Sequence, residues 1–307
     1  MHITKRLVAF IIICFTITAA AAAQAGFAVI PDNPRPGDPV TVAVSVPARE
    51  AILFMNGRQL SRALCFSVYS EGSQPGFMAA VLAVPTTAGA GDALIRINDS
   101  RGILTEIPIT IMPRDFHSET LHLNPALTSL VSDPDPVRTA ESNRLWQILN
   151  TTGNQIYHTG VFVPPVTSTR RTSRFGSRRI NQYSDGRRVT SIHAGVDYGI
   201  PTGTEVTACG RGKVILSRAR VLTGNSVIIE HAPGIYSIYY HLDSVIAEEG
   251  AIVETGQLIG LSGSTGFSTG PHLHWEIRVS TENTDPDYYT NIPIIDKELI
   301  ISRIFNR

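Results

Sequence analysis

The chain has 307 residues with 26 basic and 26 acidic side chains, so its formal net charge at neutral pH is zero. This balance argues against a nucleic-acid binder that works by bulk positive charge, and a content of 43% hydrophobic and 17% charged residues excludes a disordered chain. Three cysteines are too few for a disulfide-dense scaffold or a four-cysteine zinc site, so His and Asp would supply most ligands of any metal site.

The first 25 residues have the pattern of a secretory signal. Lys5 and Arg6 precede an apolar run over residues 7–23, and Ala25 completes a small-x-small end. This pattern predicts a signal peptide over residues 1–25. The alternative, an uncleaved anchor, is less favoured because the run is barely long enough to span about 30 Å of hydrocarbon. No second run of that length follows, so we expect an exported protein of the periplasm or cell envelope without a membrane span in the mature chain.

Residues 26–113 predict an Ig-like β-sandwich. Strict alternation from Val40 to Val46 predicts a half-buried strand, and Ile107, Ile109 and Ile111 alternate in the same way. Short apolar runs between them are separated by turn residues such as Asn56-Gly57, a spacing typical of sandwiches. The segment has no His/Asp/Glu cluster, so we expect it to bind, space or occlude.

Residues 114–165 are predicted to connect this sandwich to the rest of the chain. Asp135-Pro136 has the form of an N-cap followed by proline at the first helical position, and apolar residues then recur at helical spacing as far as Ile148. We therefore expect a connector with one helix that ends near Gly153, and Pro164-Pro165 marks the next boundary.

Residues 166–285 are again rich in predicted strands, and residues 286–307 form a tail with a short helix around residues 297–305. Glycines separate the expected strands, and no helix of credible length interrupts them, which argues against a parallel α/β sheet. The expected strands are 205–209, 213–217, 226–231, 235–242, 251–253, 257–261 and 272–279. Cys65 and Cys209 fall in different predicted domains, which favours two buried thiols over a disulfide.

Two histidines and one aspartate in this β-rich region are candidate ligands of a metal ion. His272 and His274 are two apart in a predicted strand and therefore share a face. His193 and Asp197 lie on a predicted loop that runs into a strand, from which they can meet His274 across the sheet. Two nitrogens and one oxygen suit Zn²⁺, and three protein ligands leave the open position of a catalytic site.

Such a site could perform hydrolysis, because zinc lowers the pKa of a bound water from about 15.7 toward about 7 and polarises a carbonyl. The chemistry then needs a proton acceptor and a donor to the tetrahedral oxyanion. His272 and His241 are free for these roles, whereas no His-Glu-x-x-His helix supplies a glutamate.

The motifs together resemble the lysostaphin-type (LytM-like) zinc metalloendopeptidases over about residues 166–280. The motifs that carry the resemblance are Arg174-Phe175-Gly176-Ser177-Arg178, His193-x-x-x-Asp197, Tyr240-His241-Leu242 and the run from Gly263 to His274. The resemblance implies an antiparallel β catalytic domain of the duplicated-hybrid-motif type, peptidoglycan peptides as substrate, Zn²⁺ as cofactor, and His193, Asp197 and His274 as its ligands. It also implies that His272 is the general base and that His241 is the second catalytic imidazole, which stabilises the tetrahedral intermediate.

Several alternatives stay open at this point. Gly266 to Gly270 matches the Gly-x-Ser-x-Gly elbow around Ser268, but a proline and a strand follow it rather than a helix. A non-catalytic wall-binding regulator that activates a separate hydrolase is the main alternative function. The sandwich or connector is an alternative occluder of the groove, and with this resemblance the sandwich is also a candidate contact for a cell-wall or divisome protein partner. The scissile bond also stays open among cross-links, stem peptides, glycine bridges and non-wall proteins.

A basic stretch near the predicted boundary has two interpretations. It either contacts an anionic wall polymer or substrate carboxylates, or it is a solvated loop face. Its members are Arg170, Arg171, Arg174, Arg178, Arg179, Arg187 and Arg188.

Overall fold

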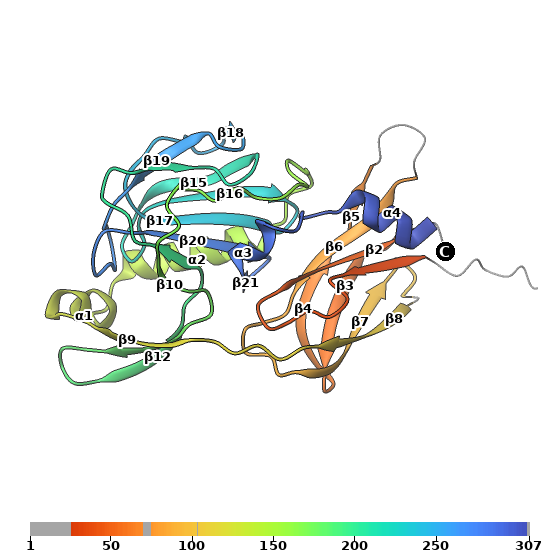
Figure 1. The fold of residues 1–307 in the computed structure, drawn as a ribbon, viewed down its shortest axis with the longest axis horizontal. Helices are drawn as coiled ribbons and strands as arrows, with labels where there is room; N and C mark the ends of the chain where they lie inside the picture. The colour runs from red at the N-terminus through yellow and green to blue at the C-terminus, as the bar shows by residue number, and fades with distance from the viewer. Residues whose placement is uncertain (1–25, 70–74, 103, 306–307) are drawn as a thin grey trace, which may run out of the picture.

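The computed structural model describes residues 26–69, 75–102 and 104–305, and the predicted signal segment lies outside these residues. Figure 1 shows two β-rich parts side by side, with the C-terminal helix returning to the part that contains the first strands. Within the described residues, no helix combines the length and the apolar character that a membrane crossing requires. The protein is mainly β, as the sequence predicts.

The first eight strands form two four-stranded antiparallel sheets that enclose a common core. The sheet orders are β1-β2-β6-β5 and β4-β3-β7-β8, and alternate residues of facing strands, such as Val42 and Ile95, are buried between them. The bounds are β1 Phe27–Ile30, β2 Pro39–Val44, β3 Glu50–Met55, β4 Arg58–Leu64, β5 Phe66–Val68, β6 Phe77–Ala83, β7 Gly91–Asn98 and β8 Leu104–Ile111.

The expectation of a half-buried strand in this region is wrong. Every residue of β2 is buried, because its second face is covered by the C-terminal segment, against which Ala43 packs. Thr41 on the same face donates from its hydroxyl to the backbone carbonyl of Ile294 at 3.1 Å. The residue that covers this face of β2 is therefore 253 positions away in the sequence, so the local alternation of residues could not predict the burial.

The segment between the two parts holds one strand and two helices, β9 Ser118–His122, α1 Pro125–Ser132 and α2 Pro136–Asn150. The expected helix is α2, whose N-cap Asp135 accepts from the backbone N–H groups of Val137 and Arg138. Helix α1 and strand β9 were not expected. Strand β9 pairs in parallel with β11 and completes a three-stranded sheet of order β12-β11-β9.

A ten-stranded antiparallel sheet forms most of the second part, in the order β10-β13-β20-β17-β16-β15-β18, with β14, β19 and β21 attached to it. Its core includes the fully buried Trp275 and Tyr239. The bounds are β10 Arg171–Ser173, β11 Arg178–Gln182, β12 Arg188–Ile192, β13 Val196–Tyr198, β14 Glu205–Thr207, β15 Gly212–Arg220, β16 Gly224–Ala232, β17 Ile235–Val245, β18 Ile252–Val253, β19 Leu258–Ser262, β20 Leu273–Val279 and β21 Glu282–Thr284.

The tail joins the two parts into one packed body. Helix α3 Pro286–Tyr289 lies beside the large sheet, and helix α4 Lys297–Phe305 packs against β1 and β2. The buried Ile300 and Ile304 belong to the same apolar cluster as Trp275. The tail helix that the sequence predicts is therefore part of a continuous core and not an appendage.

Candidate metal centre and groove

Two adjacent strands and one hairpin end bring the predicted ligands together. Asp197 on β13 lies directly opposite His274 on β20 in the antiparallel register. His193 follows β12, and its backbone exchanges hydrogen bonds with the turn before β11, through Ser177 O at 2.9 Å and the N–H of Gly176 at 2.9 Å. The Arg-Phe-Gly-Ser motif thus holds the backbone of His193 beside the sheet.

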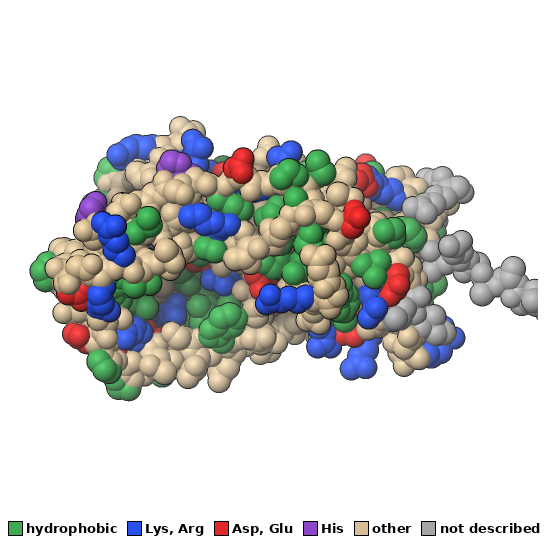
Figure 2. Space-filling view, turned by 90° about the horizontal axis from the view of Figure 1, so that it is seen from below, with side chains coloured by type: hydrophobic (Ala, Val, Ile, Leu, Met, Phe, Trp, Pro, Cys, Tyr) green, Lys and Arg blue, Asp and Glu red, His purple; other side chains and the backbone are tan. Residues whose placement is uncertain are grey.

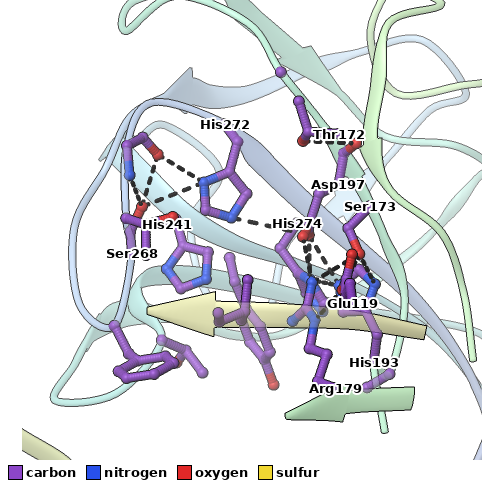
Figure 3. A pocket seen from close by; sticks show the side chains of 18 of the residues that line it. Glu119, Thr172, Ser173, Arg179, His193, Asp197, His241, Ser268, His272 and His274 are labelled. Atoms are coloured by element: carbon purple, nitrogen blue, oxygen red, sulfur yellow. Dashed lines mark hydrogen bonds and ion pairs between the residues drawn. The ribbon is translucent and has the colours of Figure 1, made fainter. Parts of the chain in front are cut away.

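The three side chains present one ligand atom each to the same point (Figure 3). His193 Nε2 lies 3.1 Å from Asp197 Oδ1 and 3.0 Å from His274 Nδ1, and His274 Nδ1 lies 2.7 Å from Asp197 Oδ1. These separations are shorter than twice a zinc–ligand distance of about 2.0–2.1 Å, so a single ion can reach all three atoms. All three residues are buried, and the donor set of two imidazoles and one carboxylate suits zinc.

The second nitrogen of each ligand imidazole is held by an acceptor. His193 Nδ1 lies 2.8 Å from the carbonyl of Arg174, and His274 Nε2 lies 3.0 Å from a carboxylate oxygen of Glu276. Since a carbonyl and a carboxylate can only accept, these nitrogens carry protons, so in the neutral ring the facing nitrogen has the lone pair that a metal requires. His274, whose pKa is raised, must release its second proton before it can bind a metal. The hydrogen bonds therefore select the tautomers of a ligand set.

The electrostatics of the three groups are those of a tightly coupled cluster. Burial opposes ionisation of Asp197, but hydrogen bonds from His193 and His274 hold its pKa well below the usual value. Burial lowers the pKa of His193. For His274, burial is outweighed by hydrogen bonds to Asp197 and Glu276, which raise its pKa to about 9. The site thus keeps a permanent negative charge at Asp197, which favours a cation.

His272 and His241 lie beside this cluster and line the same groove. Nδ1 of His272 contacts the carbonyl of Gly270 at 2.8 Å, and Nδ1 of His241 contacts the carbonyl of Thr265 at 2.8 Å. Each ring therefore has Nε2 left as a base, and the ring centroids are 4.7 Å apart. Nε2 of His272 lies 3.9 Å from Asp197 Oδ1.

The backbone and burial of His241 are both unusual. Its φ of 61° falls in the left-handed region that non-glycine residues seldom adopt, and such strain concentrates at functional sites. Burial, with His272 and His274 nearby, lowers the pKa of His241 to about 3, so the ring is neutral at physiological pH. Stabilising a negative oxygen through Nε2 then requires this ring to take up a proton, because its Nδ1 proton is donated to Thr265.

The groove has a volume of about 510 Å³, and two separate parts of the chain supply its apolar lining. One wall is the loop between β19 and β20, including Phe267, and the other is contributed by the connector and hairpin through Leu121, Val131 and Ile192. Figure 2, seen from the side of β9 and β12, shows this hollow with hydrophobic and basic side chains inside it. A groove with apolar walls and a polar floor suits an extended peptide.

Ser268 also lines the groove, but it does not have the setting of a hydrolase nucleophile. Its hydroxyl contacts the carbonyl of Gly270 at 2.8 Å, and strand β20 follows rather than a helix. The elbow geometry is therefore missing.

Four polar residues support the site in a way that the sequence did not predict, although one of them, Arg179, belongs to the basic stretch identified from the sequence. They are Glu119, Ser173, Arg179 and Glu276. The position of Glu276 could have been found, because it continues the two-residue period of His272 and His274 on one face of β20. The other three depend on long-range pairing, for which the sequence has no local signal.

The arginine stretch is not a solvated loop face throughout. Arg171 pairs with Asp287 at 2.7 Å, and Arg179 pairs with both Glu119 and Asp197. Arg170 lines the groove and donates to the carbonyl of Gly199. Cys65 and Cys209 are both free, as expected, although Cys65 is only partly buried.

Comparison with known proteins finds similar sequences over the part of the chain that holds this site. Residues 191–286 match the model of Peptidase family M23. The chain is 39% identical over 127 residues to the DD-carboxypeptidase/endopeptidase Mpg of Neisseria meningitidis, covering 41% of this chain and 28% of that protein. It is 41% identical over 116 residues to the peptidoglycan DD-endopeptidase ShyA of Vibrio cholerae, covering 38% of this chain and 26% of that protein.

The chain thus spans less than a third of the length of these curated relatives. A solved structure from Pseudomonas aeruginosa, described as a peptidase M23, matches 84% of this chain and 95% of its own with a TM-score of 0.60 at 22% identity, which shows a shared fold. The resemblance that the motifs indicate is confirmed to the extent that residues 191–286 of this chain match the model of Peptidase family M23.

Proposed function

We propose that the protein is a zinc-dependent endopeptidase that hydrolyses peptide bonds of bacterial peptidoglycan. The observation that carries the proposal is the convergence of His193, Asp197 and His274 at one point of a groove that two further imidazoles line. The similarity to a protein named as a peptidoglycan DD-endopeptidase supports the substrate class.

In this proposal His193 Nε2, Asp197 Oδ1 and His274 Nδ1 hold the ion. When bound, zinc with three protein ligands lowers the pKa of a water and polarises a substrate carbonyl. His272 accepts the proton of the attacking water through Nε2, because this nitrogen is basic and faces the ligand cluster. His272 would then return this proton to the leaving amine. His241, once protonated from solvent, would stabilise the developing negative oxygen, and the buried groove would strengthen that interaction.

Digestion of purified peptidoglycan tests this function. We expect mass spectrometry of the soluble products to show new peptide termini with intact glycan, loss of these products on chelation, and their return when zinc is added. Zinc binding without any cleavage would favour a regulator of another hydrolase. Products that carry new reducing sugar ends instead would contradict an endopeptidase.

We also propose that the protein is exported, since peptidoglycan lies outside the cytoplasmic membrane and residues 1–25 have the composition of a signal. The mature N-terminus is then Gly26. Mass measurement of the protein recovered from the cell envelope tests this, and an intact Met1 would contradict it.

A further inference from the structure

The carboxylate of Asp197 is held at both oxygens. Oδ1 faces His193 and His274, whereas Oδ2 accepts a hydrogen bond from the guanidinium of Arg179 at 2.8 Å. Arg179 lies on β11, outside the segment that matches the family model. A carboxylate that uses one oxygen as a ligand needs the other oxygen fixed, because otherwise it rotates or binds through both.

Arg179 is itself held by Glu119 (Figure 3). Its Nε donates to Glu119 Oε1 at 2.5 Å, and its terminal nitrogen also reaches the hydroxyl of Ser173 at 2.9 Å. Glu119 and Arg179 are direct register partners in the parallel pairing of β9 and β11. Both side chains are only 17% exposed, so this ion pair is shielded from water, unlike an ordinary surface pair.

A second arm of the same network reaches the other ligand. Ser173 donates from its hydroxyl to Glu119 Oε1 at 2.7 Å, and the hydroxyl oxygen of Ser173 lies 3.0 Å from His193 Nδ1. One carboxylate from the connector therefore contacts the residues behind both Asp197 and His193.

We propose that Glu119 and Arg179 are positioning residues of the metal centre, Arg179 by fixing the free oxygen of Asp197 and Glu119 by fixing Arg179. This inference rests on the proposed function only in so far as it requires a metal at the three ligands. It makes strand β9, which comes from the connector, part of the metal site.

The test is the zinc affinity of the full chain, measured by competition with a chromophoric chelator. We expect Glu119→Gln and Arg179→Met each to weaken zinc binding about 10–100-fold, as supporting residues of metal ligands do. Arg179→Lys keeps the charge but not the planar fork, so its affinity should lie between that of the wild type and that of Arg179→Met. The matched control is the exposed pair Arg218–Glu249, and Arg218→Met and Glu249→Gln should leave the affinity unchanged.

The absorption spectrum of the cobalt-substituted protein separates positioning from simple stabilisation. If the network sets ligand geometry, the visible bands of Glu119→Gln should differ from those of the wild type, whereas the control variants keep the wild-type spectrum. An unchanged affinity in Glu119→Gln and Arg179→Lys would overturn the inference. So would a weaker affinity with an unchanged cobalt spectrum, because that pattern means loss of stability alone.

The inference and the proposed function fail in different ways. If the wild-type protein binds zinc and the variants bind it more weakly, but no preparation cleaves peptidoglycan, the positioning role stands and the endopeptidase proposal falls. If the wild type binds no zinc, the positioning role is overturned. Should Arg179→Met not fold, Glu119→Gln and Arg179→Lys still decide the outcome, because both are close in shape to the native residue.

Discussion

His272 and His274 stand two positions apart at the start of one strand, yet their neighbours give them different chemistry. His274 Nε2 donates to the buried Glu276, so its Nδ1 faces the ligand cluster. His272 has Nδ1 on the carbonyl of Gly270, so its Nε2 faces the groove. In the proposed mechanism, the hydrogen bonds of the second nitrogen therefore distinguish His274 as a ligand from His272 as a base.

This difference predicts opposite outcomes for two alanine variants. His274→Ala should lose nearly all bound metal and all activity, because two protein ligands do not hold the ion. His272→Ala should keep one metal per chain and lose about 100–10,000-fold in turnover, the usual contribution of a general base. Elemental analysis and digestion assays check both, and equal loss of metal in the two variants would show that the assigned roles are wrong.

His231 predicts an acid sensitivity of folding that is separate from the site. Burial lowers its pKa to about 3, against a weaker opposing contact with the carbonyl of Arg211, whereas an unfolded histidine titrates near 6.5. Between these values the unfolded chain binds one proton more than the folded chain. The stability that neutral His231 contributes is therefore complete above pH 6.5 and falls, on the order of 1 kcal/mol per pH unit, as the pH drops toward 3.

Urea unfolding at several pH values measures this slope. His231→Gln should flatten the loss of unfolding free energy between pH 6 and pH 4, and the exposed His122→Gln should leave it as in the wild type. An identical slope in the wild type and His231→Gln would rule out this role.

Residue types and spacing were enough to predict the five histidine and aspartate positions of the candidate site. The side chains that support them were not predictable in the same way. Glu119 lies 74 residues before His193 in the sequence, and only the parallel register of β9 and β11 brings it to Arg179.

At the scale of elements, the close approach of β13 and β20 holds the ligand cluster together. A Cβ atom at Gly195 would collide with the backbone carbonyl of Trp275, and a backbone atom cannot move aside as a flexible side chain can. We expect Gly195→Ala to push the two strands apart and to weaken zinc binding at least 10-fold. Gly89→Ala, where nothing lies within 4 Å, is the matched control.

Chelator competition with both glycine variants measures this effect. Unchanged affinity in a folded Gly195→Ala protein would show that the strand spacing does not set the ligand geometry.

Some strands and helices could be predicted from the sequence, and others could not. The strands of the large sheet from β14 to β20 follow from apolar runs with glycine between them, and α2 follows from its Asp135-Pro136 start. The short strands β10, β13 and β21 of the same sheet were not expected. Strand β9 was missed because Thr120 is its one β-branched residue, and the alternation of half-buried and exposed residues is seen only in the structure. Its stability comes from pairing with β11. Helix α1 has only eight residues, too few for a strong periodic pattern.

At the scale of the whole molecule, the two β-rich parts share one apolar cluster. Ala28 and Phe77 of the sandwich belong to the same cluster as Trp275, and Ile300 of α4 is fully buried in it. Deletion of residues 26–165 would be one way to test whether the sandwich or connector occludes the groove. Because the deletion would also expose apolar surface and remove Glu119, it is a poor test of occlusion. No local pattern predicts this arrangement, because each part has a plausible core of its own.

The shared core predicts that a substitution in the tail destabilises the whole chain. Ile300→Ala should lower the unfolding free energy by about 2–5 kcal/mol, as deletion of a buried isoleucine side chain usually does. Ile180→Ala, at a position that is 40% exposed, should cost much less. Urea unfolding followed at two wavelengths checks this, and two separate transitions, only one of them shifted by Ile300→Ala, would contradict a common core.

The most direct test of the central claim is an anomalous-scattering map from crystals of the zinc-loaded protein, recorded at the zinc absorption edge. We predict one peak per chain, about 2.0–2.1 Å from His193 Nε2, Asp197 Oδ1 and His274 Nδ1. A peak ligated by His241 or His272 in place of any of these atoms, or no peak in the groove, would contradict the account.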